Sequence, residues 1–266
     1  MKSIRDLMNL GGRKALVVGG AGFIGKAVCE CLAELGASIA VHDADLSKSS
    51  PVAEEIEKDY RTKAFAVEGN LLSAEETAKI VPAALRELGG LDILVHCAAF
   101  VGTTSFPGWA VPFEEQSLEA FEAALKVNLS SAFLLAKDAA DSLSRSGKGS
   151  MIFISSIYGV VPPDFSIYEG TAMANPAGYG VSKAGLLGLT RYLATLMAPK
   201  VRVNAITPGG VYRNQPESFV EKYKEKTPLK RMAKEEDMKG AVAYLASDLS
   251  EYVTGQNIIV DGGFTL

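Results

Sequence analysis

The sequence predicts an α/β fold: a doubly wound parallel β-sheet (Rossmann fold) with helices on both faces. Short apolar runs alternate with helical patterns along the whole chain, and such alternation produces a parallel sheet. A glycine-rich turn joins the first apolar run to the first helical pattern, as in dinucleotide-binding proteins. No linker, repeat or low-complexity segment divides the chain, so we expect a single domain over residues 1–266.

Each predicted element follows from its own pattern. The strands are apolar runs rich in β-branched residues at 14–18, 38–42, 64–67, 91–96, 150–155, 201–206 and 257–260. Apolar residues at helical spacing predict helices over 27–35, 53–60, 73–88, 113–143, 176–196 and 235–247. Gly36 ends the first helix, Ser73 and Glu76 form a predicted capping box, and Pro176 can open the helix that it precedes.

The composition limits the class of protein. Hydrophobic residues make up 48% of the chain and charged residues 22%, which suits a globular domain with a substantial core. The net charge of −4 argues against nucleic acid or an anionic membrane as a partner. The start of the chain lacks the apolar core of a signal peptide, and no apolar run is long enough to span a membrane. Three cysteines and two histidines show no metal-ligand spacing, so we expect a cytoplasmic protein without a metal site.

The glycine turn predicts a dinucleotide site. Gly19, Gly22 and Gly25 allow a tight turn, close approach of backbone N–H groups to a pyrophosphate, and close packing of the helix on the sheet. Asp43 follows the second strand, where a carboxylate can accept hydrogen bonds from the adenosine ribose. An ordinary glycine-rich turn with a solvated Asp is the alternative, but strands on both sides favour the dinucleotide. No Arg or Lys occurs in the four residues after Asp43, and a carboxylate repels a 2′-phosphate, so NAD is favoured over NADP.

Tyr179 and Lys183 form the candidate catalytic pair. Residues four apart on a helix lie on the same face, so the phenol and the ammonium would point the same way. A nearby cation favours phenolate and would lower the pKa of Tyr179 from about 10, as a general acid/base requires. The alternative is a surface Tyr and Lys that share a helix face by chance. The neighbouring motifs must decide between the two interpretations.

With these residues in place, the chain resembles the short-chain dehydrogenase/reductase family, of the compact single-domain type, over nearly its whole length. The family's motifs occur in the family's order, at residues 19–25, 43, 91–95, 128, 154–156, 179 with 183, 202–209 and 254–263. Together they are far more specific than any one of them alone.

The resemblance implies a role for each of four residues. Tyr179 would be the acid/base on the substrate oxygen, and Lys183 would lower its pKa and hold the nicotinamide ribose. Ser156 would hydrogen-bond the substrate oxygen, and Asn128 would hold a water that links Lys183 to solvent. Asn128 could instead be a satisfied core amide. Strand alternation points Ser155 and Ser156 to opposite faces, so only one of them can face the substrate. The resemblance favours Ser156, and Ser155 is the alternative.

The resemblance also implies the cofactor contacts. They are Gly19, Gly22, Phe23, Ile24, Gly25, Asp43, Asn70, Leu71, Ala98, Tyr179, Lys183, Pro208, Gly209 and Val211. Asn70 stands where the family usually has an Asp that touches adenine.

Several departures from the family matter, among them Val18 in place of the usual Thr before the glycine turn. His96-Cys97-Ala98-Ala99 replaces the usual Asn-Asn-Ala-Gly, and we disfavour catalysis by His96 because it ends a strand beside the cofactor ribose. The Thr that usually follows Pro-Gly and binds the carboxamide is missing, and residues 211–214 stand there. Ser156 and Tyr179 are 23 positions apart, about ten more than is common in the family, and long loops in compact domains are usually functional or disordered. We expect the extra residues, 160–173, to bind substrate.

These features predict an NAD(H)-dependent oxidoreductase that interconverts a secondary alcohol and a ketone, with a sugar- or polyol-like substrate. The loops at 100–112, 157–178 and 208–234 would line the pocket with stacking and hydrogen-bonding side chains: Trp109, Tyr158, Tyr168, Glu169, Tyr212, Arg213 and Asn214.

Three alternatives stay open. A 3-oxoacyl, steroid-like or other carbonyl reductase is one, because aromatic loops also suit apolar ketones. Phe23 in the glycine turn favours a sugar-nucleotide epimerase or dehydratase, but these carry an added C-terminal domain, and three residues after Gly263 leave no room for one. A non-catalytic NAD-binding protein is the third, against which the Ser156, Tyr179 and Lys183 set argues. The resemblance also implies a homo-oligomer, a tetramer or dimer.

Overall fold

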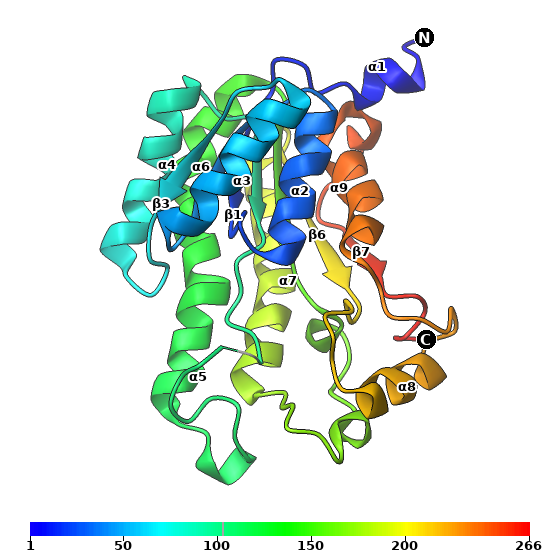
Figure 1. Cartoon of the computed structure of the whole chain (residues 1–266). Coiled ribbons are helices and arrows are strands. Elements are labelled where there is room, and N and C mark those ends of the chain that lie inside the picture. Colours follow the sequence, from blue (N-terminus) through cyan, green and yellow to red (C-terminus); the bar gives the residue numbers. More distant parts are fainter. Residues whose placement is uncertain (103) are drawn as a thin grey trace.

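Seven parallel strands form one sheet in the order β3-β2-β1-β4-β5-β6-β7, shown in the computed structural model of Figure 1, which describes residues 1–102 and 104–266. The chain winds outward from β1 in one direction and from β4 in the other, so the crevice between them is the switch point at which doubly wound sheets bind ligands. The strands are β1 (Lys14–Val18), β2 (Ser38–Asp43), β3 (Ala64–Glu68), β4 (Ile93–His96), β5 (Gly149–Ile154), β6 (Val201–Pro208) and β7 (Asn257–Val260). The predicted fold class is confirmed, and the predicted strand ends hold to within two residues.

Helices cover both faces of the sheet (Figure 1). One apolar core lies under α2 (Phe23–Glu34), α3 (Leu46–Tyr60) and α9 (Lys239–Ala246). The other lies under α4 (Ala74–Leu88), α6 (Ser131–Ser146) and α7 (Ala177–Met197). The remaining helices are α1 (Ile4–Met8), α5 (Leu118–Leu125) and α8 (Glu217–Lys226), with short 3-10 turns η1 (Phe113–Glu115), η3 (Ile157–Gly159), η4 (Phe165–Tyr168), η5 (Glu235–Met238) and η6 (Asp248–Ser250).

The prediction of one unbroken helix over residues 113–143 is wrong. Ser117 caps α5 by accepting a hydrogen bond from the Ala120 N–H at 3.1 Å. A π-helical segment, η2 (Lys126–Ser130), then joins α5 to α6. An apolar pattern with a spacing of three and four does not reveal such an interruption, because both halves keep helical periodicity.

Three smaller predictions also need correction. α3 begins at Leu46 rather than at residue 53, because the Asp45 side chain caps it by accepting from the Ser47 N–H. The apolar pattern does not reveal this start, because the first turns of the helix are mainly polar. The capping box at Ser73 is only half formed, since the Glu76 carboxylate accepts from the Asn70 N–H instead. α8 lies within the stretch predicted as a loop at 208–234.

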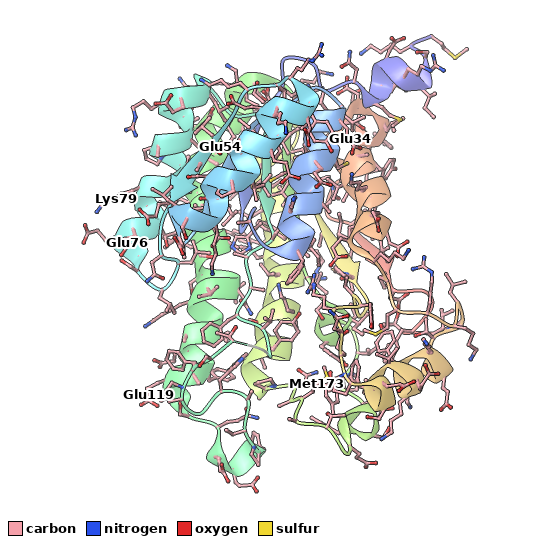
Figure 2. All side chains as sticks on the ribbon, viewed as in Figure 1. Glu34, Glu54, Glu76, Lys79, Glu119 and Met173 are labelled. Carbon is pink, nitrogen blue, oxygen red and sulfur yellow. The ribbon has the colours of Figure 1, made fainter. Side chains whose placement is uncertain are left out.

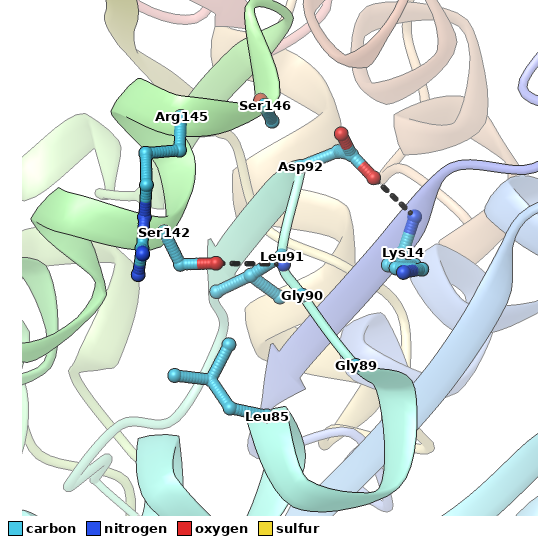
Figure 3. A pocket seen from close by; sticks show the side chains of 9 residues that line it. All are labelled: Lys14, Leu85, Gly89, Gly90, Leu91, Asp92, Ser142, Arg145 and Ser146. Carbon is cyan, nitrogen blue, oxygen red and sulfur yellow. Dashed lines mark hydrogen bonds between the residues drawn. The ribbon is translucent and has the colours of Figure 1, made fainter.

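The two ends of the sheet differ in character. At the amino ends of β1 and β4, a groove of about 500 Å³ is bordered by hydrogen bonds from the Lys14 N–H to Asp92 and from the Leu91 N–H to Ser142 (Figure 3). At the carboxyl ends, η3, η4 and α8 pack around a third apolar cluster. Met173, labelled in Figure 2, packs against this cluster and marks the extra stretch at 160–173. Among the described residues, no helix has the length and hydropathy to cross a membrane.

Candidate active site

The glycine turn forms a cradle between β1 and α2. Gly19 has φ +74°, and a Cβ there would lie 2.6 Å from the backbone of Ala98. A Cβ at Gly25 would lie 2.0 Å from the Gly19 carbonyl oxygen, whereas one at Gly22 would meet only that oxygen, at 3.3 Å. The turn is therefore closed toward β4 and open toward the crevice, with the N-terminus of α2 beside it. Such a cradle fits a dinucleotide diphosphate.

The other predicted cofactor residues border this crevice unevenly. Asp43 ends β2 half-buried, and one of its carboxylate oxygens accepts from the Ala44 N–H at 2.9 Å. Asn70 is exposed, but its side-chain oxygen already accepts from the Leu72 N–H. Leu71 points its side chain into the core, so only its backbone can reach a ligand. Of the rest, Phe23 is exposed, Ile24, Ala98 and Gly209 are half-buried, and Pro208 and Val211 are buried.

Tyr179, Lys183 and Ser156 meet where α7 passes the carboxyl end of β5. Tyr179 is half-buried, and the Lys183 Nζ lies 5.8 Å from the centroid of its ring. The Lys183 side chain is 1% exposed and its ammonium donates to the Ile154 carbonyl oxygen at 2.8 Å. Ser156 is near enough to Tyr179 for its hydroxyl to lower the tyrosine pKa. The helical spacing of four thus places both side chains on the same side of α7.

The predicted lowering of the Tyr179 pKa is wrong, because the pKa lies above the ordinary value. Burial raises the pKa of Tyr179, while Ser156 and Arg213 oppose that rise. The ammonium is held toward the strand end by Ile154 rather than toward the phenol oxygen. Burial also lowers the pKa of Lys183 to about 8, since a charge in an apolar surrounding is disfavoured.

The two serines after β5 take different directions. The Ser155 hydroxyl donates to the Lys183 carbonyl oxygen at 2.9 Å and so ties the strand end to α7. The Ser156 hydroxyl accepts from the Tyr158 N–H at 3.3 Å and lies beside Tyr179. Alternation along the strand therefore leaves Ser156, not Ser155, on the side of the phenol.

Asn128 acts as a clamp inside the π-helical segment. Its side-chain oxygen accepts from the Phe100 N–H at 2.5 Å. Its amide nitrogen donates to the Phe100 carbonyl at 3.3 Å and to the Ser182 hydroxyl at 2.8 Å. Both amide hydrogens are therefore used, so this residue could hold a water linked to Lys183 only through the second lone pair of its side-chain oxygen or through its backbone.

His96 is buried at the end of β4 and does not reach the crevice. Its Nε2 lies 2.8 Å from the Ser131 hydroxyl, which donates its own hydrogen to the Val127 carbonyl at 2.6 Å. Nε2 therefore carries a hydrogen, and Nδ1 has no partner among the described residues. Burial lowers the pKa of His96 to about 3.

The prediction that Trp109 lines the pocket is wrong. The indole is 1% exposed, donates from Nε1 to the Val101 carbonyl at 2.7 Å, and meets the Phe100 ring edge-on at 4.9 Å. It belongs to the core under α5. The loop at 100–112 includes residue 103, which lies outside the described residues.

Sequence reasoning missed a pair of tyrosine hydroxyls. Tyr158 and Tyr168 lie 2.6 Å apart at their phenol oxygens, and the Asn175 amide lies 3.5 Å from that of Tyr168. Burial raises the pKa of both tyrosines, and Tyr179 is close enough to contribute. Tyr158, Tyr168 and Asn175 all border a cavity of about 1050 Å³, whose other lining residues are mainly apolar. Nothing in the spacing of Tyr158 and Tyr168 along the chain indicates this contact.

Among the residues that the structure describes, no group of three His, Cys, Asp or Glu side chains comes together as a metal site would require.

Comparisons with known proteins agree with this geometry. A family model described as "Enoyl-(Acyl carrier protein) reductase" matches residues 19–265. The chain is 34% identical to a 3-oxoacyl-[acyl-carrier-protein] reductase of Aquifex aeolicus, over 96% of this chain and 98% of the relative. It is 31% identical to glucose 1-dehydrogenase 2 of Bacillus subtilis, over 97% and 96%. Its structure resembles a short-chain dehydrogenase from Leptospira borgpetersenii with bound NAD+, with a TM-score of 0.84, 34% identity, and coverage of 100% and 97%.

Proposed function

The chain belongs to the short-chain dehydrogenase/reductase family, whose members are oxidoreductases acting on CH–OH groups, and we propose that it interconverts a secondary alcohol and a ketone with NAD(H). The observation that carries the proposal is the meeting of Tyr179, Ser156 and Lys183 beside the glycine cradle, at the carboxyl ends of the strands.

The chemistry assigns a task to each of these side chains. The nicotinamide, when bound, supplies hydride exchange with the carbinol carbon. In oxidation, the alcohol proton must leave as the hydride leaves, and the Tyr179 oxygen would accept it. The Ser156 hydroxyl would donate to the same substrate oxygen and stabilise its developing charge. A positively charged Lys183 would stabilise the phenolate, and its ammonium would hold the nicotinamide ribose when the cofactor is bound.

Asp43 supports NAD as the cofactor. One carboxylate oxygen is used by the Ala44 N–H, and the other is not bonded among the described residues, which leaves it for a ribose hydroxyl. A 2′-phosphate at the same place would meet a negative charge.

Tyr158, Tyr168 and Asn175 support a polar substrate of the sugar or polyol kind. Two phenol hydrogens are available, and one is used between the two oxygens. If Asn175 donates to Tyr168, the other phenol hydrogen has no acceptor among the described residues. A substrate oxygen close to the reacting carbon would satisfy it. The name of the glucose dehydrogenase relative is in line with such a substrate.

A 3-oxoacyl substrate is the second candidate. The cavity beside the tyrosine pair is bordered by apolar side chains, including Val111, Phe113, Val160 and Phe165, which would suit an acyl chain. The 3-oxoacyl reductase relative is in line with this reading. An epimerase, a dehydratase or a non-catalytic NAD-binding protein would make no net NADH and is a rival that the assay below separates.

We extend the proposal to a homo-oligomer in the cytoplasm. Val181, Tyr192 and Leu196 are exposed on α7 at helical spacing, and Phe133 is exposed on α6, so an apolar face is available to a second copy. Light scattering after gel filtration and cell fractionation test these two points.

The central experiment is Tyr179→Phe, assayed by NADH absorbance on polyols, sugars and 3-oxoacyl thioesters with NAD and NADP separately. The variant should lose turnover by at least about 1000-fold, as for a general acid/base in its hydrogen-bonded site, while NADH still binds by fluorescence titration. Tyr192→Phe, an exposed tyrosine on the same helix, is the control and should keep full activity. Full activity in Tyr179→Phe would refute the mechanism.

A further inference from the structure

Arg213 reaches across the crevice from the loop after β6 to the glycine turn. Its guanidinium carbon lies 4.3 Å from the centroid of the Phe23 ring, at the start of α2. The same guanidinium is close enough to Tyr179 to lower the tyrosine pKa. One side chain therefore lies between the cradle of the diphosphate and the phenol that meets the substrate.

The backbone that carries Arg213 is held in place. The Tyr212 N–H donates to the Ala233 carbonyl at 2.9 Å, and the Gly210 N–H donates to the Tyr223 hydroxyl at 2.6 Å. Gln215 accepts from the Arg213 N–H at 2.6 Å and donates to the Val211 carbonyl at 2.8 Å. These bonds fix the backbone from which the side chain starts, and the guanidinium is then held by its contacts with Glu235 and Phe23.

The guanidinium itself has donors to spare. Its Nε pairs with Glu235 at 3.2 Å, and its face rests on Phe23. Its two terminal nitrogens have no hydrogen-bond partner among the described residues. A guanidinium that is stacked on a ring still presents its N–H groups in its own plane, where they can bind a phosphate through two parallel bonds.

Two other cations have partners of their own, whereas the two terminal nitrogens of Arg213 have none among the described residues. Lys26, one residue after the glycine turn, pairs with Glu55 at 2.7 Å. Lys183 donates to Ile154 at the strand end. A diphosphate bound on the α2 N-terminus would carry two negative charges, and Arg213 is the side chain placed to oppose them.

We propose that Arg213 binds the diphosphate of the cofactor, with Phe23 as the platform that orients the guanidinium, and so closes the crevice over the bound nucleotide. The proposal rests on the proposed function, in which NAD(H) occupies the glycine cradle.

The test measures binding to the full chain by titration calorimetry, without turnover. The probes are NADH, ADP-ribose, which keeps the diphosphate but lacks nicotinamide, and adenosine, which lacks the diphosphate. Arg213→Ala should weaken NADH and ADP-ribose binding alike, by about 10- to 100-fold, as for loss of charge-assisted hydrogen bonds, and leave adenosine within about twofold. Arg213→Lys should fall between, and Phe23→Leu should weaken NADH by about threefold through loss of the cation–π contact.

Arg231→Ala is the matched control, because it removes an arginine from the same loop that pairs with Asp237 rather than with Phe23. It should leave NADH affinity unchanged. Unchanged ADP-ribose affinity in Arg213→Ala overturns the proposal, and a raised KM for substrate beside it would assign Arg213 to the substrate instead. If the unmutated chain binds neither NADH nor ADP-ribose, the proposed function fails as well, so the two failures are distinguishable.

Discussion

Replacing Lys183 with methionine should stabilise the ligand-free protein at neutral pH and abolish turnover. The ammonium is 1% exposed and has no carboxylate partner among the described residues. Its burial lowers its pKa from 10.5 to about 8. Methionine has a similar length and keeps the side-chain volume in place while it removes the charge.

The expected gain can be worked out from this pKa. At 1.36 kcal/mol per pKa unit, keeping Lys183 charged inside the fold costs about 3 kcal/mol. The variant also loses the hydrogen bond to the Ile154 carbonyl, which contributes about 2 kcal/mol in the opposite direction. The net stabilisation at pH 7 should therefore be about 1 kcal/mol.

The pH dependence gives a sharper test. Above pH 8 the folded chain releases the Lys183 proton, while the unfolded chain keeps it up to pH 10.5, so the unfolded state binds more protons and stability rises with pH. Between pH 7 and 9.5 the unmutated protein should gain about 2 kcal/mol that Lys183→Met cannot gain. The variant should be the more stable of the two at pH 7 and the less stable at pH 9.5.

Urea unfolding at both pH values measures this crossover. The single tryptophan, Trp109, is buried and reports unfolding by fluorescence. Lys200→Met, at an exposed position after α7, serves as the control and should show no crossover. A stability difference between Lys183→Met and the unmutated protein that stays constant with pH would refute the reasoning.

Three further predictions concern single side chains. Asp43→Asn should raise the ratio of kcat/KM with NADP to that with NAD by about tenfold or more, because a charge facing the 2′-phosphate is removed; an unchanged ratio in steady-state assays would mean that Asp43 does not face the ribose. Tyr168→Phe should raise KM for a polar substrate by about tenfold and leave NADH affinity unchanged, with the exposed Tyr252→Phe as control; an unaltered KM would remove the tyrosine pair from substrate binding. His96 has a folded-state pKa near 3, so its stabilising contribution is complete above pH 6.5 and is lost as pH falls towards 3. His96→Asn should therefore lose less stability than the unmutated protein between pH 7 and 5 in urea unfolding, and an equal loss would contradict the burial of a neutral imidazole.

The sheet could be predicted because each strand carries its own local signal. Residues 14–18 and 257–260 are apolar runs with clear turns beside them, and both are strands with those bounds. The break in the helix from residue 113 could not be predicted, because one extra residue in the backbone leaves the apolar pattern of Leu125 and Leu129 intact.

In the candidate site, the side-chain positions that follow from spacing along the sequence could be predicted, whereas those that depend on packing in three dimensions could not. Tyr179 and Lys183 share a side of α7 because four residues make about one turn. The direction in which the tyrosine pKa shifts is set by burial, against the opposing effects of Ser156 and of Arg213, which is 34 positions away in the chain. The aromatic character of Trp109 says nothing about whether its ring faces a pocket or Phe100.

The π-helical segment Lys126–Ser130 restricts the number of residues that can stand between α5 and α6. The bond from the Ser131 N–H to the Lys126 carbonyl spans one residue more than the hydrogen bond of a regular α-helix, and one residue corresponds to about 100° of rotation. Deleting one of the segment's four residues other than Asn128 would let the backbone relax into an ordinary helix and swing Asn128 away from Phe100 and Ser182. Insertions and deletions should therefore not be tolerated in these five positions, whether in evolution or in engineering.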